Sequence, residues 1–129
     1  PGLGREIELP ALKDNGGKEV RLEALRSREG HEGKIVMLTF WCTTCHSCRA
    51  IERGFDAKAK EYADRGVFFV MVDSSYTDSP DSVNQFLAKR ELGFPVLMDP
   101  ESEYARYFDT KLTTTTAVID GKGRLRYFG

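Results

Sequence analysis

The stretch that decides the fold of this 129-residue chain is Phe40-Trp41-Cys42-Thr43-Thr44-Cys45-His46-Ser47-Cys48-Arg49. It contains all 3 cysteines, so no disulfide can join distant segments and a disulfide scaffold is excluded. Cysteines gathered in one turn indicate redox chemistry, metal binding or haem attachment. The surrounding sequence decides which of these to expect.

The residues on either side of this stretch predict a strand followed by a helix. Residues 34–41 form a nearly continuous apolar run, which is typical of a central strand covered on both faces. After the cysteines, apolar residues recur at helical spacing and predict an amphipathic helix of about four turns, with Gly66 as its stop. Its charged residues, Glu52 and Asp56 among them, are expected on the polar sides. At least one cysteine should occupy the first turn, where free N–H groups and the helix dipole favour a thiolate.

The rest of the chain alternates strands and helices. A β-hairpin is predicted over 5–25, an exposed loop over 26–33, a second buried strand over 67–72, a helix from the Ser79 cap and Pro80 to about Gly93, a short strand over 95–98, a short helix over 101–108, and a closing hairpin of 115–119 with 124–128. This order predicts an α/β sheet with helices on both faces. In such sheets the chemistry lies beyond the carboxyl ends of the strands, where the cysteines fall.

Composition narrows the function classes. The 19 basic and 20 acidic residues give a net charge of -1, which provides no field for nucleic acid. The longest uncharged stretch, residues 35–48, is too short and too polar to span a bilayer. We expect one domain over residues 1–129, because the chain can bury one core but not two. It starts at Pro1 without a charged-then-apolar leader, so any signal or anchor is expected to have been removed.

The cysteine stretch resembles the F-W-A-x-W-C-x-x-C-R active site of thioredoxin-fold redoxins, the TlpA-like and AhpC/TSA-like thiol-disulfide oxidoreductases. Three further segments match this family: the leading hairpin from Leu9-Pro10 to Lys18-Glu19-Val20, the F-P-V-L-x-D-P segment at 94–100, and the I-D-x-x-G turn at 118–123. The resemblance covers nearly the whole chain. It implies a thioredoxin-like fold, with a central mixed sheet flanked by helices and an N-terminal β-hairpin extension.

The resemblance also implies roles for the site residues. Cys45 would be the exposed attacking thiol and Cys48 the resolving thiol, with His46 and Ser47 between them. The dithiol would exchange with protein thiols or disulfides and with an upstream electron donor or acceptor, without a cofactor. The implied setting is extracytoplasmic, either periplasmic or membrane-anchored and facing outward.

Three positions depart from the family pattern. Thr114, in the segment Thr113-Thr114-Thr115-Thr116, stands where the family has a cis-proline. A non-proline cis bond costs roughly 2.5–4 kcal/mol, so we expect a trans bond and an altered substrate-docking loop. Thr39 replaces the acid that thioredoxins carry before the Phe-Trp pair, so the buried proton acceptor is missing there. The chain stops at Gly129, where the family continues into a last helix.

Cys42 leaves several interpretations open. The plain expectation is a buried small hydrophobe, and the sharper one is a third redox thiol that exchanges with Cys45. Cys42, Cys45 and His46 also fit the C-x-x-C-H haem signature, but the other histidine, His31, lies in a polar loop, and the methionines fall in predicted strands. A metal site would need ligands that follow one another on a single turn, whereas structural zinc draws pairs from separate segments.

Two further classes stay as alternatives. A peroxiredoxin-like peroxidase would carry Thr at position 42 and an Arg in the late loop, and this chain has neither. A binding module with little turnover is the other, because Thr114 alters the docking loop.

Trp41 is expected in the core. Asp73 ends a strand on the catalytic side and could influence the thiols, although an exposed strand-end carboxylate is the commoner case.

Overall fold

The computed structural model describes residues 1–23 and 35–129, so the predicted loop over 26–33 lies outside the described residues. The elements in chain order are β1 (Leu12–Asp14), β2 (Glu19–Val20), β3 (Ile35–Phe40), α2 (Arg49–Glu61), β4 (Val67–Asp73), α3 (Pro80–Arg90), β5 (Val96–Met98), α4 (Glu103–Tyr107), β6 (Thr116–Ile119) and β7 (Leu125–Phe128). Each element overlaps a predicted one. The described helices include none that is both long and apolar enough to cross a membrane.

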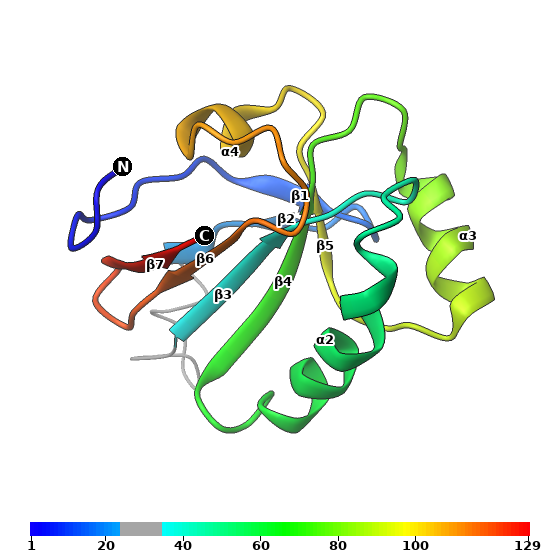
Figure 1. Cartoon of the computed structure of the whole chain (residues 1–129), viewed down its shortest axis with the longest axis horizontal. Coiled ribbons are helices and arrows are strands. Elements are labelled where there is room, and N and C mark those ends of the chain that lie inside the picture. Colours follow the sequence, from blue (N-terminus) through cyan, green and yellow to red (C-terminus); the bar gives the residue numbers. More distant parts are fainter. Residues whose placement is uncertain (24–34) are drawn as a thin grey trace.

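The strands form one 7-stranded sheet in the order β2-β1-β5-β4-β3-β6-β7 (Figure 1). Strands β3, β4 and β5 run parallel, and the other neighbouring pairs are antiparallel, which confirms the predicted mixed sheet. The apolar run ahead of the cysteines is β3, which pairs with β4 on one side and β6 on the other. The cysteine stretch therefore leaves the carboxyl end of a central strand.

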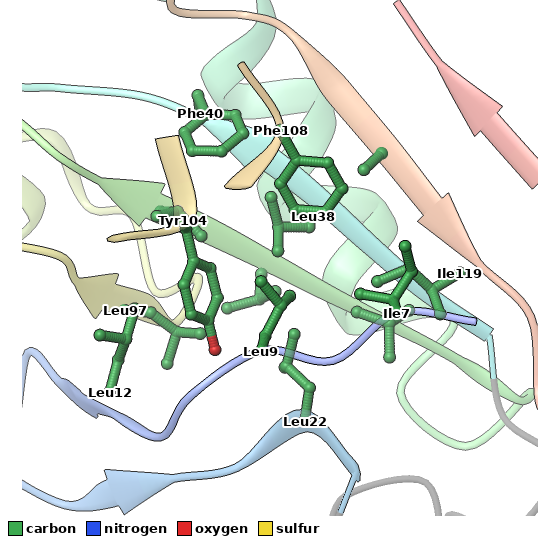
Figure 2. Packing of buried hydrophobic residues seen from close by; sticks show 14 of the residues in the cluster. Ile7, Leu9, Leu12, Leu22, Leu38, Phe40, Leu97, Tyr104, Phe108 and Ile119 are labelled. Carbon is green, nitrogen blue, oxygen red and sulfur yellow. The ribbon is translucent and has the colours of Figure 1, made fainter. Parts of the chain in front are cut away.

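The two faces of the sheet carry separate cores. On one face, Leu38 and Phe40 of β3 pack with α4 and the N-terminal segment; on the other, Met71 of β4 packs with α2 and α3. The alternation follows from the pleat, which points successive side chains to opposite faces. Figure 2 shows the α4-side core, with Tyr104 among its buried residues. The Tyr104 hydroxyl donates to the Pro10 carbonyl at 2.7 Å.

Helix α3 begins as predicted and ends early. The Ser79 hydroxyl accepts from the Ser82 N–H at 3.2 Å, the Ser82 hydroxyl accepts from the Ser79 N–H at 2.9 Å, and Pro80 follows the cap. This reciprocal cap satisfies N–H groups that a helix start leaves free. The helix ends at Arg90 because Glu91 takes the left-handed conformation, with φ 57°, before Gly93 is reached.

The polar side of α2 is not wholly solvent-facing, which corrects the prediction for two residues. Glu52 and Asp56 are only 2% and 6% exposed. Asp56 Oδ1 accepts from the Gly93 N–H at 2.9 Å, and Glu52 has partners in the site described below. Both carboxylates lie where donors from other segments replace water. The helix also ends at Glu61, ahead of Gly66. The Tyr62 N–H makes the last helical bond, to the Lys58 carbonyl, and the Tyr62 backbone then leaves helical geometry, with φ −97° and ψ 4°.

Candidate active site

Two consecutive backbone turns form the active loop. The Cys45 N–H donates to the Cys42 carbonyl at 3.4 Å, and the Cys48 N–H donates to the Cys45 carbonyl at 3.2 Å. Cys48 is the N-cap of α2, one position before the predicted first turn, and its carbonyl accepts from the Glu52 N–H at 3.2 Å. Cys45 thus lies at the junction of two turns and faces the start of the helix.

The Cys45 thiol is surrounded by hydrogen-bond donors. Cys45 Sγ lies 2.8 Å from Thr113 Oγ1, 3.2 Å from Ser47 Oγ and 3.2 Å from the Cys48 backbone nitrogen. Burial works to raise the pKa of Cys45, but hydrogen bonds from the Cys48 thiol, Ser47, Thr113 and the Cys48 N–H outweigh it and lower the pKa from 9.0 to about 7. A large share of Cys45 is therefore thiolate at neutral pH, the reactive form of a cysteine.

Cys48 has the opposite properties. Its side chain is 0% exposed and packs in the core on the α2–α3 side. Burial raises its pKa to about 12, and the hydrogen bond that it donates to Cys45 acts in the same direction. The pair therefore consists of one accessible, acidic thiol and one buried thiol that keeps its proton.

The other predicted supporting residues take different positions. Ser47 and Thr113 touch the Cys45 sulfur, whereas the His46 side chain is exposed. Trp41 is 1% exposed, which confirms the core prediction, and its Nε1–H donates to Glu52 Oε2 at 2.7 Å.

Arg49 ties the active loop to helix α2. Its guanidinium pairs with Glu52 and donates to the Thr43 carbonyl, and it lies over the Phe86 ring at 4.4 Å from the centroid. Glu52 is thus satisfied by Trp41 and Arg49, two residues that flank the cysteines in sequence. Sequence analysis placed Glu52 on a polar side, because helical periodicity does not show which donors other segments supply.

Thr114 shapes the loop opposite Cys45. The described residues include no cis peptide bond, so the trans prediction holds, but Thr114 has φ 70° in the left-handed region. A β-branched residue there is strained. Its N–H donates to the Phe40 carbonyl at 2.6 Å, which anchors the loop to β3 and keeps Thr113 beside Cys45. Thr39, where thioredoxins carry an acid, is buried and bonds through its hydroxyl to Thr116 at 2.9 Å.

Asp78, which sequence analysis missed, holds the other side of the active loop. Its carboxylate accepts from the Thr43 N–H at 2.9 Å and from the Thr43 hydroxyl at 2.5 Å, and from the Ser82 hydroxyl at 3.2 Å. These bonds join the loop to the start of α3. No motif in the sequence marks Asp78, because the contact spans 35 positions and depends on the path of the chain after β4.

Asp73 is buried, which overturns the expectation of an exposed strand-end carboxylate. It is 1% exposed, and its Oδ2 has no donor beside it among the described residues. Burial and a hydrogen bond to the Asp78 carboxylate raise its pKa to about 8. For Asp78, burial is outweighed by the hydrogen bonds from Asp73 and Thr43, which hold its pKa below the usual range. At neutral pH Asp73 therefore mostly keeps its proton, whereas Asp78 is ionised.

A cavity of about 480 Å³ opens beside the active loop on the α4 side of the sheet. The ends of β3 and β4, helix α4 and the loop before β6 line it, with Phe40, Cys42, Val72, Ala105, Leu112 and Thr113 among the contributors. Cys42 is half-buried and lines this cavity, so the expectation of a fully buried hydrophobe is wrong. Its Sγ lies 3.6 Å from Thr44 Oγ1.

The haem and metal alternatives receive little geometric support. Within residues 1–23 and 35–129, no group of three or more His, Cys, Asp and Glu side chains is placed to hold a metal ion. Met37, Met71 and Met98 all lie in strands, and His31 lies outside the described residues.

Residues 3–128 match the AhpC/TSA family. The chain belongs to the AhpC/TSA family. The chain is 33% identical over 97 residues to the thioredoxin-like protein YneN of Bacillus subtilis. The match covers 75% of this chain and 56% of YneN. It is 28% identical over 114 residues to the thiol-disulfide oxidoreductase ResA of the same species, covering 88% of this chain and 59% of ResA. The chain thus spans less than two thirds of either relative.

A solved structure supports the fold of this AhpC/TSA member. The putative thiol:disulfide interchange protein DsbE of Chlorobium tepidum superposes with a TM-score of 0.82 at 24% identity, over 98% of this chain and 84% of that one. The thioredoxin-like fold that the sequence predicts is therefore confirmed.

Proposed function

We propose that this chain is a thiol-disulfide oxidoreductase that exchanges a Cys45-Cys48 dithiol with protein partners through a mixed disulfide. The observation that carries the proposal is the contrast between the two thiols. Cys45 is accessible with a pKa of about 7, and Cys48 is buried with a pKa of about 12. Only the thiolate attacks a disulfide, so Cys45 is the group that meets a substrate.

In the reducing direction, the Cys45 thiolate attacks one sulfur of a substrate disulfide. A Cys45–substrate bond forms, the substrate S–S bond breaks, and the second substrate sulfur leaves as a thiolate. The Cys45 sulfur is now neutral, so the hydrogen bond and the charge that raised the pKa of Cys48 are lost. Cys48 then gives up its proton and attacks Cys45 Sγ, which releases the substrate and leaves the Cys45–Cys48 disulfide. The oxidising direction reverses these steps.

The surface around the cavity supports a protein partner. Leu112 at its rim is 73% exposed, and Tyr76, next to the cavity-lining Ser75, is 92% exposed. These exposed side chains would offer apolar contacts to a protein bound over the cavity. We place the partner and its upstream donor or acceptor in an extracytoplasmic compartment, as the resemblance to TlpA-like proteins implies; fractionation of the source cells tests this placement.

The test of the proposed function is a thiol count with intact mass over a glutathione redox series. In the wild type, two thiols should titrate together, and peptide mapping should find the Cys45–Cys48 disulfide. Cys45→Ser should abolish this couple. Absence of a two-electron couple in the wild type would favour the binding module, and peroxide consumption faster than exchange with protein disulfides would favour the peroxidase.

A further inference from the structure

Cys45 is flanked by two cysteines at the same backbone separation. One hydrogen-bonded turn runs from Cys42 to Cys45 and the next from Cys45 to Cys48. A β-turn brings its first and last Cα atoms within about 7 Å. A disulfide joins Cα atoms about 4.4–6.8 Å apart. Backbone geometry therefore allows Cys45 to pair with either neighbour.

The two neighbours of Cys45 have different surroundings. Phe40 belongs to the α4-side core and Trp41 to the α2–α3-side core. Cys42 continues this alternation and lines the cavity on the α4 side, whereas Cys48 packs with Trp41. One partner of Cys45 therefore borders the cavity, and the other is enclosed in the core.

The wall of the cavity includes Cys42 but not Cys48. Thr113 lines the cavity and also contacts Cys45 Sγ at 2.8 Å, so a group attached to Cys45 can extend into it. Cys42 is half-buried in the cavity lining, and Cys48 is 0% exposed. Cys42 is therefore the cysteine next to Cys45 that a group held in the cavity can contact.

We propose that Cys42 is a second resolving thiol for Cys45, which releases substrates held in the cavity. This inference rests on the proposed function, because it takes Cys45 as the attacking thiol. The Cys42 thiolate attacks Cys45 Sγ, a Cys42–Cys45 bond forms, and the Cys45–substrate bond breaks as the substrate leaves as a thiolate. Cys48, after losing its proton, can then attack Cys45 Sγ and release Cys42. Each step exchanges one S–S bond for another and needs no added oxidant.

The step requires one local rearrangement. Cys42 Sγ lies 3.6 Å from Thr44 Oγ1 in the reduced protein, so its side chain must rotate about χ1 to face Cys45. Such rotation moves between staggered wells and leaves the backbone turn unchanged.

The test is a variant that keeps only the proposed pair. Reduced Cys48→Ser protein is treated with glutathione disulfide and analysed by intact mass and peptide mapping. The expected product is an intramolecular Cys42–Cys45 disulfide, with loss of the glutathione adduct on Cys45. The matched control is the double variant Cys42→Ser, Cys48→Ser, which should keep the adduct because it lacks both resolving thiols. Cys48→Ala repeats the experiment without a hydroxyl in the buried site.

The results separate the two proposals. If the single variants keep the glutathione adduct as the double variant does, or form only disulfide-linked dimers, Cys42 is not a resolving thiol. The proposed function stands in that case, provided that wild-type protein still forms the Cys45–Cys48 disulfide. If the wild type forms no disulfide, the proposed function fails first.

Discussion

The two sides of the active loop differ in how they treat polar groups. On the α2–α3 side, Cys48 is buried without solvent access, and Glu52 is satisfied by Trp41 and Arg49. On the α4 side, Cys42 borders a cavity of about 480 Å³. The buried side holds a thiol that keeps its proton, and the open side is where we propose that the substrate enters. One short loop therefore joins a buried, fully packed environment around Cys48 to an open cavity beside Cys42.

The largest effect should come from Trp41→Ala on the buried side. The change removes an indole that packs edge-on against Phe86 and Phe94, and it leaves Glu52 Oε2 without its donor. Loss of a buried Trp typically lowers the free energy of unfolding by about 3–5 kcal/mol. Urea unfolding of the wild type and the variant measures this difference in free energy. Trp41→Phe, which keeps an aromatic ring but no N–H, should cost less; equal costs would show that packing is not the main contribution.

Asp78→Ala should have the next largest effect, because it frees the active loop from α3. The carboxylate accepts from the Thr43 N–H and hydroxyl, and hydrogen bonds to charged groups contribute about 1.5–3 kcal/mol each to stability when buried. Because Asp78 is only half-buried, we expect the free energy of unfolding to fall by an amount near the lower end of this range, as measured by urea unfolding. Cys42 should also be alkylated faster, because the loop is less restrained. A double-mutant cycle with Thr43→Val isolates the hydroxyl bond. Additive effects of the two substitutions would contradict the contact.

The pH dependence of stability tests the raised pKa of Asp73 beside Asp78. The folded-state pKa of Asp73 is raised from 3.8 to about 8, so the unfolded chain ionises first as pH rises. Stability from this group is therefore complete below about pH 3.8 and is lost progressively up to about pH 8. Asp73→Asn keeps a donor toward Asp78 without a titrating proton. Between these pH values the free energy of unfolding should fall with rising pH in the wild type and fall less in the variant. Equal slopes for the two proteins would contradict the raised pKa of Asp73.

The smallest effect should come from the strained loop opposite Cys45. Thr114 has φ 70°, and a side chain in the left-handed region costs roughly 1–2 kcal/mol, which glycine avoids. Because glycine also adds entropy to the unfolded chain, Thr114→Gly should raise the melting temperature only slightly. The neighbouring Thr115→Gly, at a position without positive φ, serves as the matched control and should lower it. A loss of stability in both variants would show that Thr114 is not strained.

Much of the fold follows from local sequence signals. The strand periodicity of β3 and β4 and the Ser79 cap are local, and the structure confirms them. The cysteine neighbourhood was also predictable, because Ser47 and Trp41 are near it in the chain. The burial of Glu52 and Asp73 and the contacts of Asp78 were not predictable. A carboxylate is buried where distant donors or a second carboxyl group receive it, and a single sequence does not reveal those partners.

The position of Cys42 was also beyond sequence analysis. Burial of a free cysteine is the common case, and here the fold leaves a cavity beside it instead. The cavity arises because α4 and the loop ending at Thr113 stand apart at the carboxyl end of β3. Only the assembled sheet shows that one cysteine beside Cys45 lines a cavity and the other packs in a core.

The central claim is that Cys45 is the acidic, attacking thiol, and the pH dependence of alkylation addresses it most directly. Reduced protein is pulsed with iodoacetamide across a pH series, and each cysteine is quantified by peptide mapping. We predict that Cys45 reacts first, with a midpoint near pH 7, and that Cys48 stays unmodified through the neutral range. Thr113→Val should move the Cys45 midpoint upward, because it removes one of the hydrogen bonds to the thiolate. If Cys42 or Cys48 carries the lowest midpoint instead, the assignment of the attacking thiol is wrong.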